Sequence, residues 1–246
     1  MKGIRSARPN RRQILVAGAV AAAATTVGGT QQAFASGYGS GDLGDWQSQG
    51  KAIASDATIR SVRDSDGVFM FGDSIGVQDG YSLAVRLGDR TGDLLAVNNW
   101  SGRPTEPAVD ALQSWATNFG MPRRILMATG TNDIFTPPDF GPQVDRVMQI
   151  AGPTRTVIWV NVQVSRWSQT TATQLADQRN GAWINLMLAD RQKTYPNLKI
   201  VHWAEFLAAM PSRLTMYLRD GVHTSVPDGQ NARNELIVQA LAAAKV

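Results

Sequence analysis

The feature that most restricts the fold of this chain is an alternation of short, wholly apolar segments with longer amphipathic ones. Apolar runs of four to eight residues are expected to form strands at 68–71, 94–97, 125–128, 157–164 and 198–203. Helical patterns lie at about 78–89, 106–119, 141–151, 171–193 and 229–244. Continuous apolar runs are typical of parallel strands that are buried on both faces. The alternation therefore predicts an α/β fold of three layers, α/β/α, with a parallel sheet of about five strands.

The first 35 residues have the features of an export signal. The first 12 residues hold five basic residues and no acidic one. An Ala/Val-rich run follows at about 14–27, and Ala33-Phe34-Ala35 comes directly before Ser36. A basic head, a short apolar core and an A-x-A site define a cleavable signal. The core is shorter than the roughly 20 residues of a membrane span, although an uncleaved anchor is the alternative. We therefore expect no stable membrane span once the signal is removed.

The export route can also be addressed from the basic head. Arg11-Arg12 before the apolar run fits a twin-arginine signal, the address for proteins that are exported already folded. Paired arginines are also common in general secretory signals, so both routes stay open. In either case the sequence predicts a protein that is secreted or lies at the exterior of the cell envelope.

The charge of the chain does not indicate a nucleic-acid partner. The sequence has 24 Lys+Arg and 20 Asp+Glu, a net charge of +4, but the first 35 residues hold five of the cations and none of the acids. The remainder has 19 cations against 20 acids, a net charge of −1. The basic character belongs to the signal, and we expect no binding of nucleic acid.

The rest of the chain is expected to be one domain. Residues 36–50 are rich in glycine and serine and predict a flexible lead-in, and residues 51–246 are long enough for a single core. The chain has no cysteine, which excludes disulfides, a thiolate nucleophile and a zinc–thiolate site. We expect a monomer.

Glycine and polar residues follow the predicted strands or precede the last helix. In a parallel α/β sheet the functional crevice lies outside the carboxyl ends of the strands, so these groups are expected to converge there. The groups are Gly72-Asp73-Ser74, Gly102, Gly130-Thr131-Asn132-Asp133 and Asp220-Gly221-Val222-His223.

Ser74 can be a nucleophile only if the chain supplies a base and a group that orients the base. Of the two histidines, His202 lies inside an apolar run and is expected to pack in the core. His223 lies in a polar loop three residues after Asp220, a spacing that lets the carboxylate reach its ring. The interpretation is a Ser-His-Asp triad, and the alternative is an ordinary serine in a strand-to-helix turn.

An oxyanion formed during such chemistry needs donors that are already in place. The backbone N–H groups of Ser74 and Gly102 and the side-chain amide of Asn132 are candidates, and the lack of a Cβ at Gly102 would let substrate approach the backbone closely. The alternative is that the glycines only make turns and that Asn132 caps a helix.

Taken together and in this order, the four segments resemble the conserved blocks of the SGNH (GDSL-type) hydrolase family over about residues 66–245. The resemblance implies a flavodoxin-like α/β/α fold with Ser74 as nucleophile, His223 as base and Asp220 as its orienting acid. It also implies an oxyanion hole made of Ser74, Gly102 and Asn132.

Other site chemistries find less support. Residues 72–76 also fit the G-x-S-x-G elbow of α/β-hydrolases. Fewer than about 40 residues of the mature chain precede Ser74, which leaves little room for the strands and loop that come before that elbow. The chain has no H-E-x-x-H motif and its two histidines are far apart, so we expect neither a metal nor another cofactor.

The sequence therefore predicts an exported serine esterase that hydrolyses short acyl esters through an acyl-enzyme. Segments 160–167, 195–197 and 220–223 look like a subgroup of SGNH domains associated with glycan acyltransferases. This resemblance keeps open an O-acyltransferase or deacetylase of cell-wall or surface glycans. A non-catalytic glycan-binding module is the third possibility. Trp100 and Arg103 either shape the acyl pocket or bind substrate, or are surface turn residues. The sequence assigns no role to Arg166.

Overall fold

The computed structural model describes residues 37–245, so the predicted export signal lies outside the described residues. Six strands form one sheet in the order β1-β3-β2-β4-β5-β6. Strands β2 to β6 run parallel, and β1 pairs antiparallel with β3 at one edge. The strands are β1 (Lys51–Ile53), β2 (Val68–Gly72), β3 (Leu95–Trp100), β4 (Arg124–Ala128), β5 (Thr156–Val160) and β6 (Leu198–Val201).

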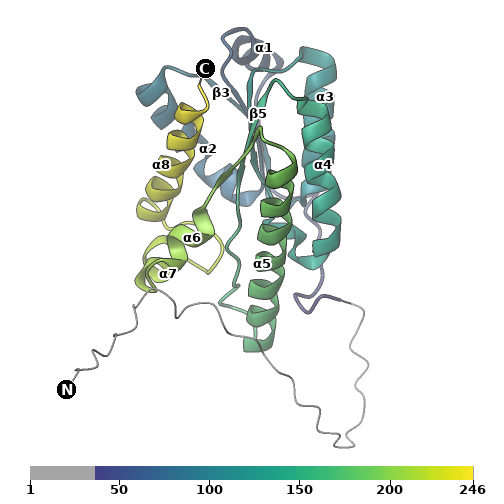
Figure 1. The fold of residues 1–246 in the computed structure, drawn as a ribbon. Coiled ribbons are helices and arrows are strands. Elements are labelled where there is room, and N and C mark those ends of the chain that lie inside the picture. The colour runs from purple at the N-terminus through teal and green to yellow at the C-terminus, as the bar shows by residue number, and fades with distance from the viewer. Residues whose placement is uncertain (1–36, 246) are drawn as a thin grey trace, which may run out of the picture. The chain divides into compact units, whose positions relative to one another are not determined.

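Helices cover both faces of this sheet, as Figure 1 shows. Helices α2 (Ser74–Thr91) and α8 (Asp228–Ala243) pack on one face. The other face carries α1 (Asp56–Asp64), α3 (Thr105–Phe119), α4 (Phe140–Ala151) and α5 (Thr171–Thr194). Short turns complete the chain: η1 (Thr131–Phe135), η2 (Pro137–Asp139), α6 (Trp203–Ala208) and α7 (Ser212–Tyr217). The predicted three-layer fold with five parallel strands is confirmed, and the sequence analysis missed β1, α1 and the short helices.

The central strand β2 shows why the sheet is buried on both faces. Phe69 and Phe71 pack into the core beneath α1 and α3, whereas Val68 and Met70 pack into the core beneath α2 and α8. All four are fully buried. Alternate side chains of a strand point to opposite faces, and burial of each stabilises the fold by about 1.5–3 kcal/mol. An apolar run with no polar residue is therefore stable only in the middle of the sheet.

Residues 37–50 form only turns and bends, but they contact the fold at several points. The Asn180 side chain in α5 donates to the Tyr38 carbonyl and to Ser40 Oγ, both at 3.0 Å. The Trp46 ring meets the Trp100 ring edge-on, with centroids 4.9 Å apart. The segment that the sequence predicts as a lead-in thus contacts α5 and β3 through specific side chains.

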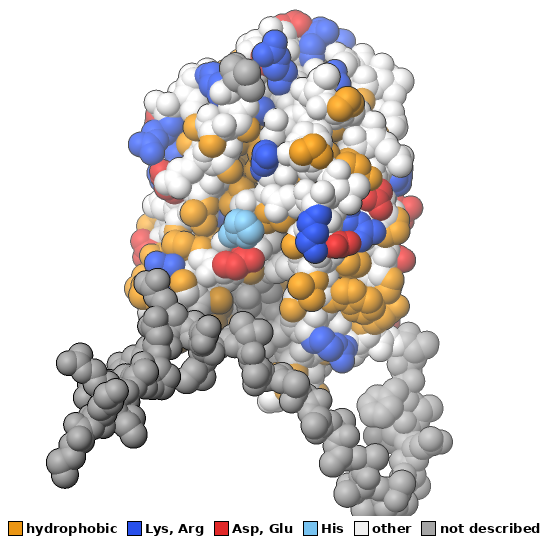
Figure 2. Space-filling model, in the orientation of Figure 1, with side chains coloured by type: hydrophobic (Ala, Val, Ile, Leu, Met, Phe, Trp, Pro, Cys, Tyr) orange, Lys and Arg blue, Asp and Glu red, His pale blue; other side chains and the backbone are white. Residues whose placement is uncertain are grey.

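None of the helices in residues 37–245 combines the length and the hydrophobicity that a bilayer crossing requires. Positive and negative side chains are interspersed over the face of the molecule seen in Figure 2.

Candidate active site

The structure brings together the three residues that the sequence predicted to form a triad. Ser74 Oγ lies 2.8 Å from His223 Nε2, and His223 Nδ1 lies 2.8 Å from Asp220 Oδ2. Ser74 begins α2 directly beyond the carboxyl end of β2, whereas Asp220 and His223 lie in the loop before α8. This is the hydrogen-bond order in which a histidine can take a proton from a serine while a carboxylate fixes its tautomer.

The turn that carries Ser74 is packed tightly against the core. Asp73 is fully buried and accepts a hydrogen bond from the Ile75 N–H at 3.0 Å, which caps the start of α2. Burial raises the pKa of Asp73, while the positive charge of Arg233 opposes that rise. A Cβ on Gly76 would lie 2.8 Å from Asn99 Cγ, so the first turn of α2 rests directly on a β3 side chain. The serine backbone is fixed by packing.

The loop that carries His223 is organised by Asp220. Asp220 Oδ1 accepts from the N–H groups of Val222 and His223, at 3.0 and 2.8 Å, and its Oδ2 faces the imidazole. Burial acts to raise the pKa of Asp220, but the hydrogen bonds from His223 and Val222 outweigh it and hold that pKa below its ordinary value. The carboxylate thus stays ionised where it can stabilise a protonated ring.

Two anchors hold this loop in place. On one side, the N–H groups of Ser165 and Trp167 donate to the carbonyls of Gly221 and Asp220, at 3.0 and 3.1 Å. On the other side, Thr224 Oγ1 donates to the Asp79 carboxylate, 3.0 and 2.9 Å from its two oxygens. Asp79 is fully buried in α2, the helix that begins with Ser74. The sequence analysis missed Asp79 because nothing in a helical pattern marks one acid as an anchor for a distant loop.

The predicted oxyanion donors line the same cavity as Ser74 and His223. Gly102 has φ +76°, which favours glycine, and a Cβ there would lie 2.9 Å from Trp46 Cβ. Asn132 Nδ2 donates to the Arg103 carbonyl at 3.1 Å. A side-chain amide has two N–H donors, so one hydrogen of Asn132 holds the side chain and the other is available to a bound oxygen atom.

Arg103 is not a surface turn residue, so that expectation for it is wrong. Its side chain is buried, donates to the Gly72 carbonyl at 2.9 Å and to Asn98 Oδ1 at 2.7 Å, and also contacts the Asn98 carbonyl. Burial lowers the pKa of Arg103 to about 10, which leaves it charged at neutral pH. It joins the ends of β2 and β3 because strand-end carbonyls need a donor where the sheet ladder stops.

Asp133, the last residue of the Gly130–Asp133 block, has a structural task. Both of its carboxylate oxygens accept from the Thr105 N–H at 3.1 Å, and Oδ2 accepts from Thr105 Oγ1 at 2.8 Å, which starts α3. Burial raises the pKa of Asp133 to about 6. The block therefore combines a cleft residue, Asn132, with a buried helix cap.

The prediction that His202 packs in the core is wrong. Its side chain is 61% exposed and lies 3.4 Å from Glu205, between the end of β6 and the start of α6. The strand ends at Val201, and Trp203 turns inward instead. Where an apolar run continues past the end of a strand, some of its side chains are exposed to solvent.

The cavity beside Ser74 has a volume of about 640 Å³, and the segment 42–49 forms one of its walls. Trp100 supports that wall from behind, since its Nε1 donates to the Gln49 carbonyl at 3.1 Å. Arg166 also lines this cavity, and Asp177 holds its guanidinium through contacts of 2.8 and 2.7 Å. A smaller cavity of about 260 Å³ adjoins Ser74 and is lined in part by Ile134, Phe135, Val164 and Val222.

Among residues 37–245, no group of three or more His, Cys, Asp or Glu side chains is placed to hold a metal ion.

No protein-family model and no curated protein sequence matches the chain. Solved structures do match it. A GDSL-like lipase from Bacteroides thetaiotaomicron aligns with a TM-score of 0.61 at 17% identity, covering 76% of this chain and 92% of that one. A lipase/acylhydrolase from Enterococcus faecalis gives 0.55 at 19% identity, covering 73% and 98%.

A third similar structure is an acyltransferase. The C-terminal catalytic domain of peptidoglycan O-acetyltransferase A from Streptococcus pneumoniae, solved with a methylsulfonyl adduct, gives a TM-score of 0.53 at 18% identity and covers 73% of this chain and 92% of that domain. These likenesses agree on the architecture. The chain has the SGNH hydrolase fold, as its sequence resemblance predicted.

Proposed function

We propose that this protein is an exported serine esterase that hydrolyses short acyl esters through a covalent acyl-enzyme. The observation that carries the proposal is the continuous hydrogen-bond chain from Ser74 through His223 to Asp220, with both links at 2.8 Å. It opens on a cavity that Gly102 and Asn132 also line. The basic, apolar and A-x-A segments of residues 1–35 support export.

In the first half of the reaction, His223 Nε2 takes the hydroxyl proton as Ser74 Oγ attacks the ester carbonyl carbon. The carbonyl oxygen becomes an oxyanion, and the N–H groups of Ser74 and Gly102 and one amide hydrogen of Asn132 stabilise it. Asp220 stabilises the protonated ring through Nδ1. The ring then returns its proton to the departing alkoxide, which leaves the acyl group on Ser74.

In the second half, a water molecule replaces the alcohol. His223 takes a proton from that water, the resulting hydroxide attacks the acyl carbon, and the ring gives the proton to Ser74 Oγ as the acid leaves. The same residues act in the same positions in both halves. No cofactor is needed for any of these steps.

The two cavities beside Ser74 support a short acyl group. The smaller, about 260 Å³, has an apolar side made of Ile134, Phe135, Val164 and Val222, which suits an acyl chain of a few carbons. The larger, about 640 Å³, has polar side chains such as Gln49, Gln78 and Asn132 beside apolar ones, which suits the alcohol part of the ester. Ligand sites of this size usually bury most of a small molecule.

A second candidate function is acyl transfer to, or deacetylation of, a cell-wall or surface glycan. The likeness to the peptidoglycan O-acetyltransferase domain favours it. The chemistry up to the acyl-enzyme is identical. In acyl transfer a sugar hydroxyl then replaces water as the second nucleophile, whereas deacetylation keeps water and differs only in having a sugar ester as substrate. A non-catalytic module would have no use for an intact triad.

The test is hydrolysis of p-nitrophenyl acetate by the purified full chain and by Ser74→Ala and His223→Ala. We expect each variant to lose at least about a thousandfold in kcat/KM while keeping its fold by circular dichroism. Ser114→Ala and His202→Ala are matched controls, because both residues are exposed and lie outside the site. Full activity in Ser74→Ala would contradict the proposal.

The two candidate functions separate when a neutral oligosaccharide is added to the same assay. Faster release of p-nitrophenol together with an acetylated sugar, detected by mass spectrometry, indicates transfer. Release of acetate with no sugar product indicates hydrolysis.

A further inference from the structure

A second cavity, of about 550 Å³, lies behind the loop that carries the triad histidine. Two chain segments separate it from the cleft at Ser74: residues 162–168 and the loop 220–223. The two segments are joined by backbone hydrogen bonds from Ser165 to Gly221 and from Trp167 to Asp220, at 3.0 and 3.1 Å. We call this cavity the neutral pocket. It is lined by Val162, Gln163, Val164, Ser165, Trp167, Gln174, Gln178, Gly181, Ala182, Asn185, Ala204, Glu205, Ala208, Leu214, Leu218 and Gly221.

Most residues of the partition between the neutral pocket and the triad cleft line only one of the two, although Val164 lines both the neutral pocket and the smaller cavity beside Ser74. Ser165, Trp167 and Gly221 line the neutral pocket. Arg166 and Asp220 line the cavities beside Ser74. This alternation is the ordinary property of extended chain, in which neighbouring side chains point to opposite faces. Ser74 itself does not line the neutral pocket.

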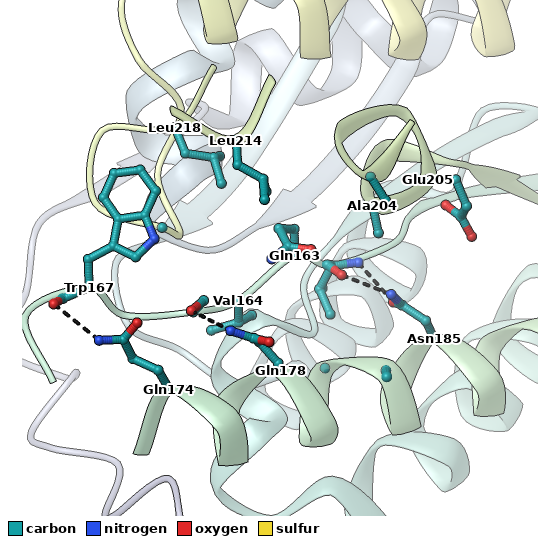
Figure 3. Close-up of a pocket in the computed structure, with 16 residues that line it drawn as sticks. Gln163, Val164, Trp167, Gln174, Gln178, Asn185, Ala204, Glu205, Leu214 and Leu218 are labelled. Carbon is teal, nitrogen blue, oxygen red and sulfur yellow. Dashed lines mark hydrogen bonds between the residues drawn. The ribbon is translucent and has the colours of Figure 1, made fainter. Parts of the chain in front are cut away.

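Amide side chains dominate one wall, as Figure 3 shows. Gln178 Nε2 donates to Ser165 Oγ at 2.9 Å, and Gln174 Nε2 donates to the Gln169 carbonyl at 2.8 Å. Gln178 donates one of its two amide hydrogens to the wall, and Gln174 also donates to the Trp167 carbonyl at 3.3 Å, so both side chains are held while their Oε1 acceptors are left for a ligand. Gln163 lines the pocket as well and offers both kinds of group.

The opposite wall is apolar. Leu214 and Leu218 face the amides across the pocket in Figure 3. Trp167 stands at one end with 40% of its surface exposed, so part of its ring is open to a ligand. Gly181 and Ala182 of α5 contribute little volume and keep the space open. The pocket thus offers hydrogen-bonding amides on one side and hydrocarbon with an indole on the other.

The charge of the lining restricts the ligand further. Among the described residues that line the neutral pocket, Glu205 alone carries a charge, and its carboxylate is engaged by Asn161 Nδ2 at 2.6 Å. A phosphate or carboxylate ligand would find no cation there. A lipid chain would match only the apolar wall and would make no hydrogen bond to the amide groups.

A neutral sugar ring matches each part of this lining. Its hydroxyl groups both donate and accept, which suits amides, and its faces of C–H groups suit leucine side chains and an indole. We infer that the neutral pocket binds a neutral saccharide, as a site separate from the catalytic serine. The inference does not depend on the proposed ester chemistry, since no residue of the triad lines the pocket.

Titration calorimetry of the full chain with cellotetraose and with the tetramer of N-acetylglucosamine tests this inference. Both probes are uncharged, and cellotetraose carries no acyl group that Ser74 could attack. We expect at least one of them to bind, and tetragalacturonate, which is anionic, to bind more weakly. Ser74→Ala should bind as the wild type does, because the serine is not part of the pocket.

Ala182→Trp provides the blocking variant. Ala182 is exposed on α5 and lines the pocket, so an indole there fills space without disturbing the core. Binding should weaken at least about tenfold. Ala189→Trp, at an exposed alanine of the same helix that does not line the pocket, is the matched control and should bind normally. Binding of neither neutral probe, equal binding by Ala182→Trp, or a preference for tetragalacturonate would each overturn the inference.

Discussion

Ser74 and His223 meet at a hydrogen bond of 2.8 Å, but the chain supports them in different ways. Ser74 follows a fully buried strand, and the first turn of its helix packs on Asn99 with no room for a Cβ at Gly76. His223 belongs to a loop in which Asp220 keeps 45% of its side chain exposed. The serine is held by core packing, and the histidine is held by a few hydrogen bonds.

This difference indicates which property each region controls. A change on the serine side removes or strains core contacts, so it should lower the free energy of unfolding. A change on the histidine side mainly moves the imidazole, so it should lower kcat with a smaller effect on stability. The predictions below test that division.

The largest effect after loss of the nucleophile or base is expected from Asp220→Asn. The amide cannot stabilise a protonated ring and favours the wrong tautomer, so kcat should fall by about 10³ to 10⁴. KM should change little, because Asp220 contacts the ring and not the scissile bond. Steady-state kinetics with p-nitrophenyl acetate measure both constants. A loss of less than tenfold in kcat would show that Asp220 does not orient the base.

Gly221→Ala adds a methyl group to the loop that holds His223, and Gly76→Ala adds the same group to the first turn of the helix that begins with Ser74. At Gly221 the Cβ would lie 1.8 Å from the Ser165 carbonyl oxygen at φ +87°, so the loop must move and kcat should fall about a hundredfold. At Gly76 the Cβ would press on Asn99, which should cost about 1–3 kcal/mol of unfolding free energy. Urea unfolding measures the loss of stability in each variant, and steady-state kinetics measure the loss of kcat. If Gly221→Ala lost stability and kept its kcat, the division between the two supports would be wrong.

Thr224→Val removes the hydroxyl that joins the histidine loop to Asp79 on α2. We expect kcat to fall about tenfold, with a stability loss of only about 1 kcal/mol, because the Asp79 carboxylate keeps its hydrogen bonds from Gln78 and Gln230. Thr224→Ser restores the donor and should restore most of kcat. A merely structural role would lower the melting temperature in Thr224→Val without any change in kcat.

The low pKa of Asp220 predicts a pH dependence of stability. A carboxyl whose pKa is lower in the folded than in the unfolded chain contributes stability that is present above the unfolded value, about 3.8, and is lost as the pH falls through the folded value. The wild type should therefore exceed Asp220→Asn in melting temperature at pH 6, and the difference should shrink below about pH 4. A difference that stays constant down to pH 2 would exclude this contribution.

The smallest effect is expected from Trp46→Ala, which alters the wall of the larger cavity rather than either support. The segment 42–49 would lose the edge-on contact between the Trp46 and Trp100 rings, so KM for esters of bulky alcohols should rise a few-fold with kcat nearly unchanged. Comparison of p-nitrophenyl acetate with an acetylated disaccharide measures this. An equal fall of kcat for both substrates would mean that the wall also positions the triad.

The sequence predicted the parts of this molecule that depend on local pattern. The unbroken apolar run of β2 marked a central strand, and glycine and polar residues at strand ends marked Ser74 and Asn132. Contacts between distant segments left no such mark. The bond from Thr224 to Asp79 and the wall formed by residues 42–49 depend on tertiary structure alone.

Where the prediction failed, one general cause applies. The burial of Arg103 and the exposure of His202 are both decided at strand ends, where the side-chain pattern of the strand no longer controls direction. The edge strand β1 was missed because it has only three residues, too few for a visible alternation. Local pattern predicts elements well, whereas the residues between elements depend on what the fold brings beside them.

The most direct measurement of the central claim is covalent labelling of Ser74. The full chain would be treated with methanesulfonyl fluoride and its intact mass recorded, followed by peptide mapping. The account predicts a single methylsulfonyl group on the peptide that contains Ser74, labelling of Ser114→Ala at the same rate, and no labelling of Ser74→Ala. Labelling of Ser74→Ala at the wild-type rate, or a label mapped to another residue, would contradict the account.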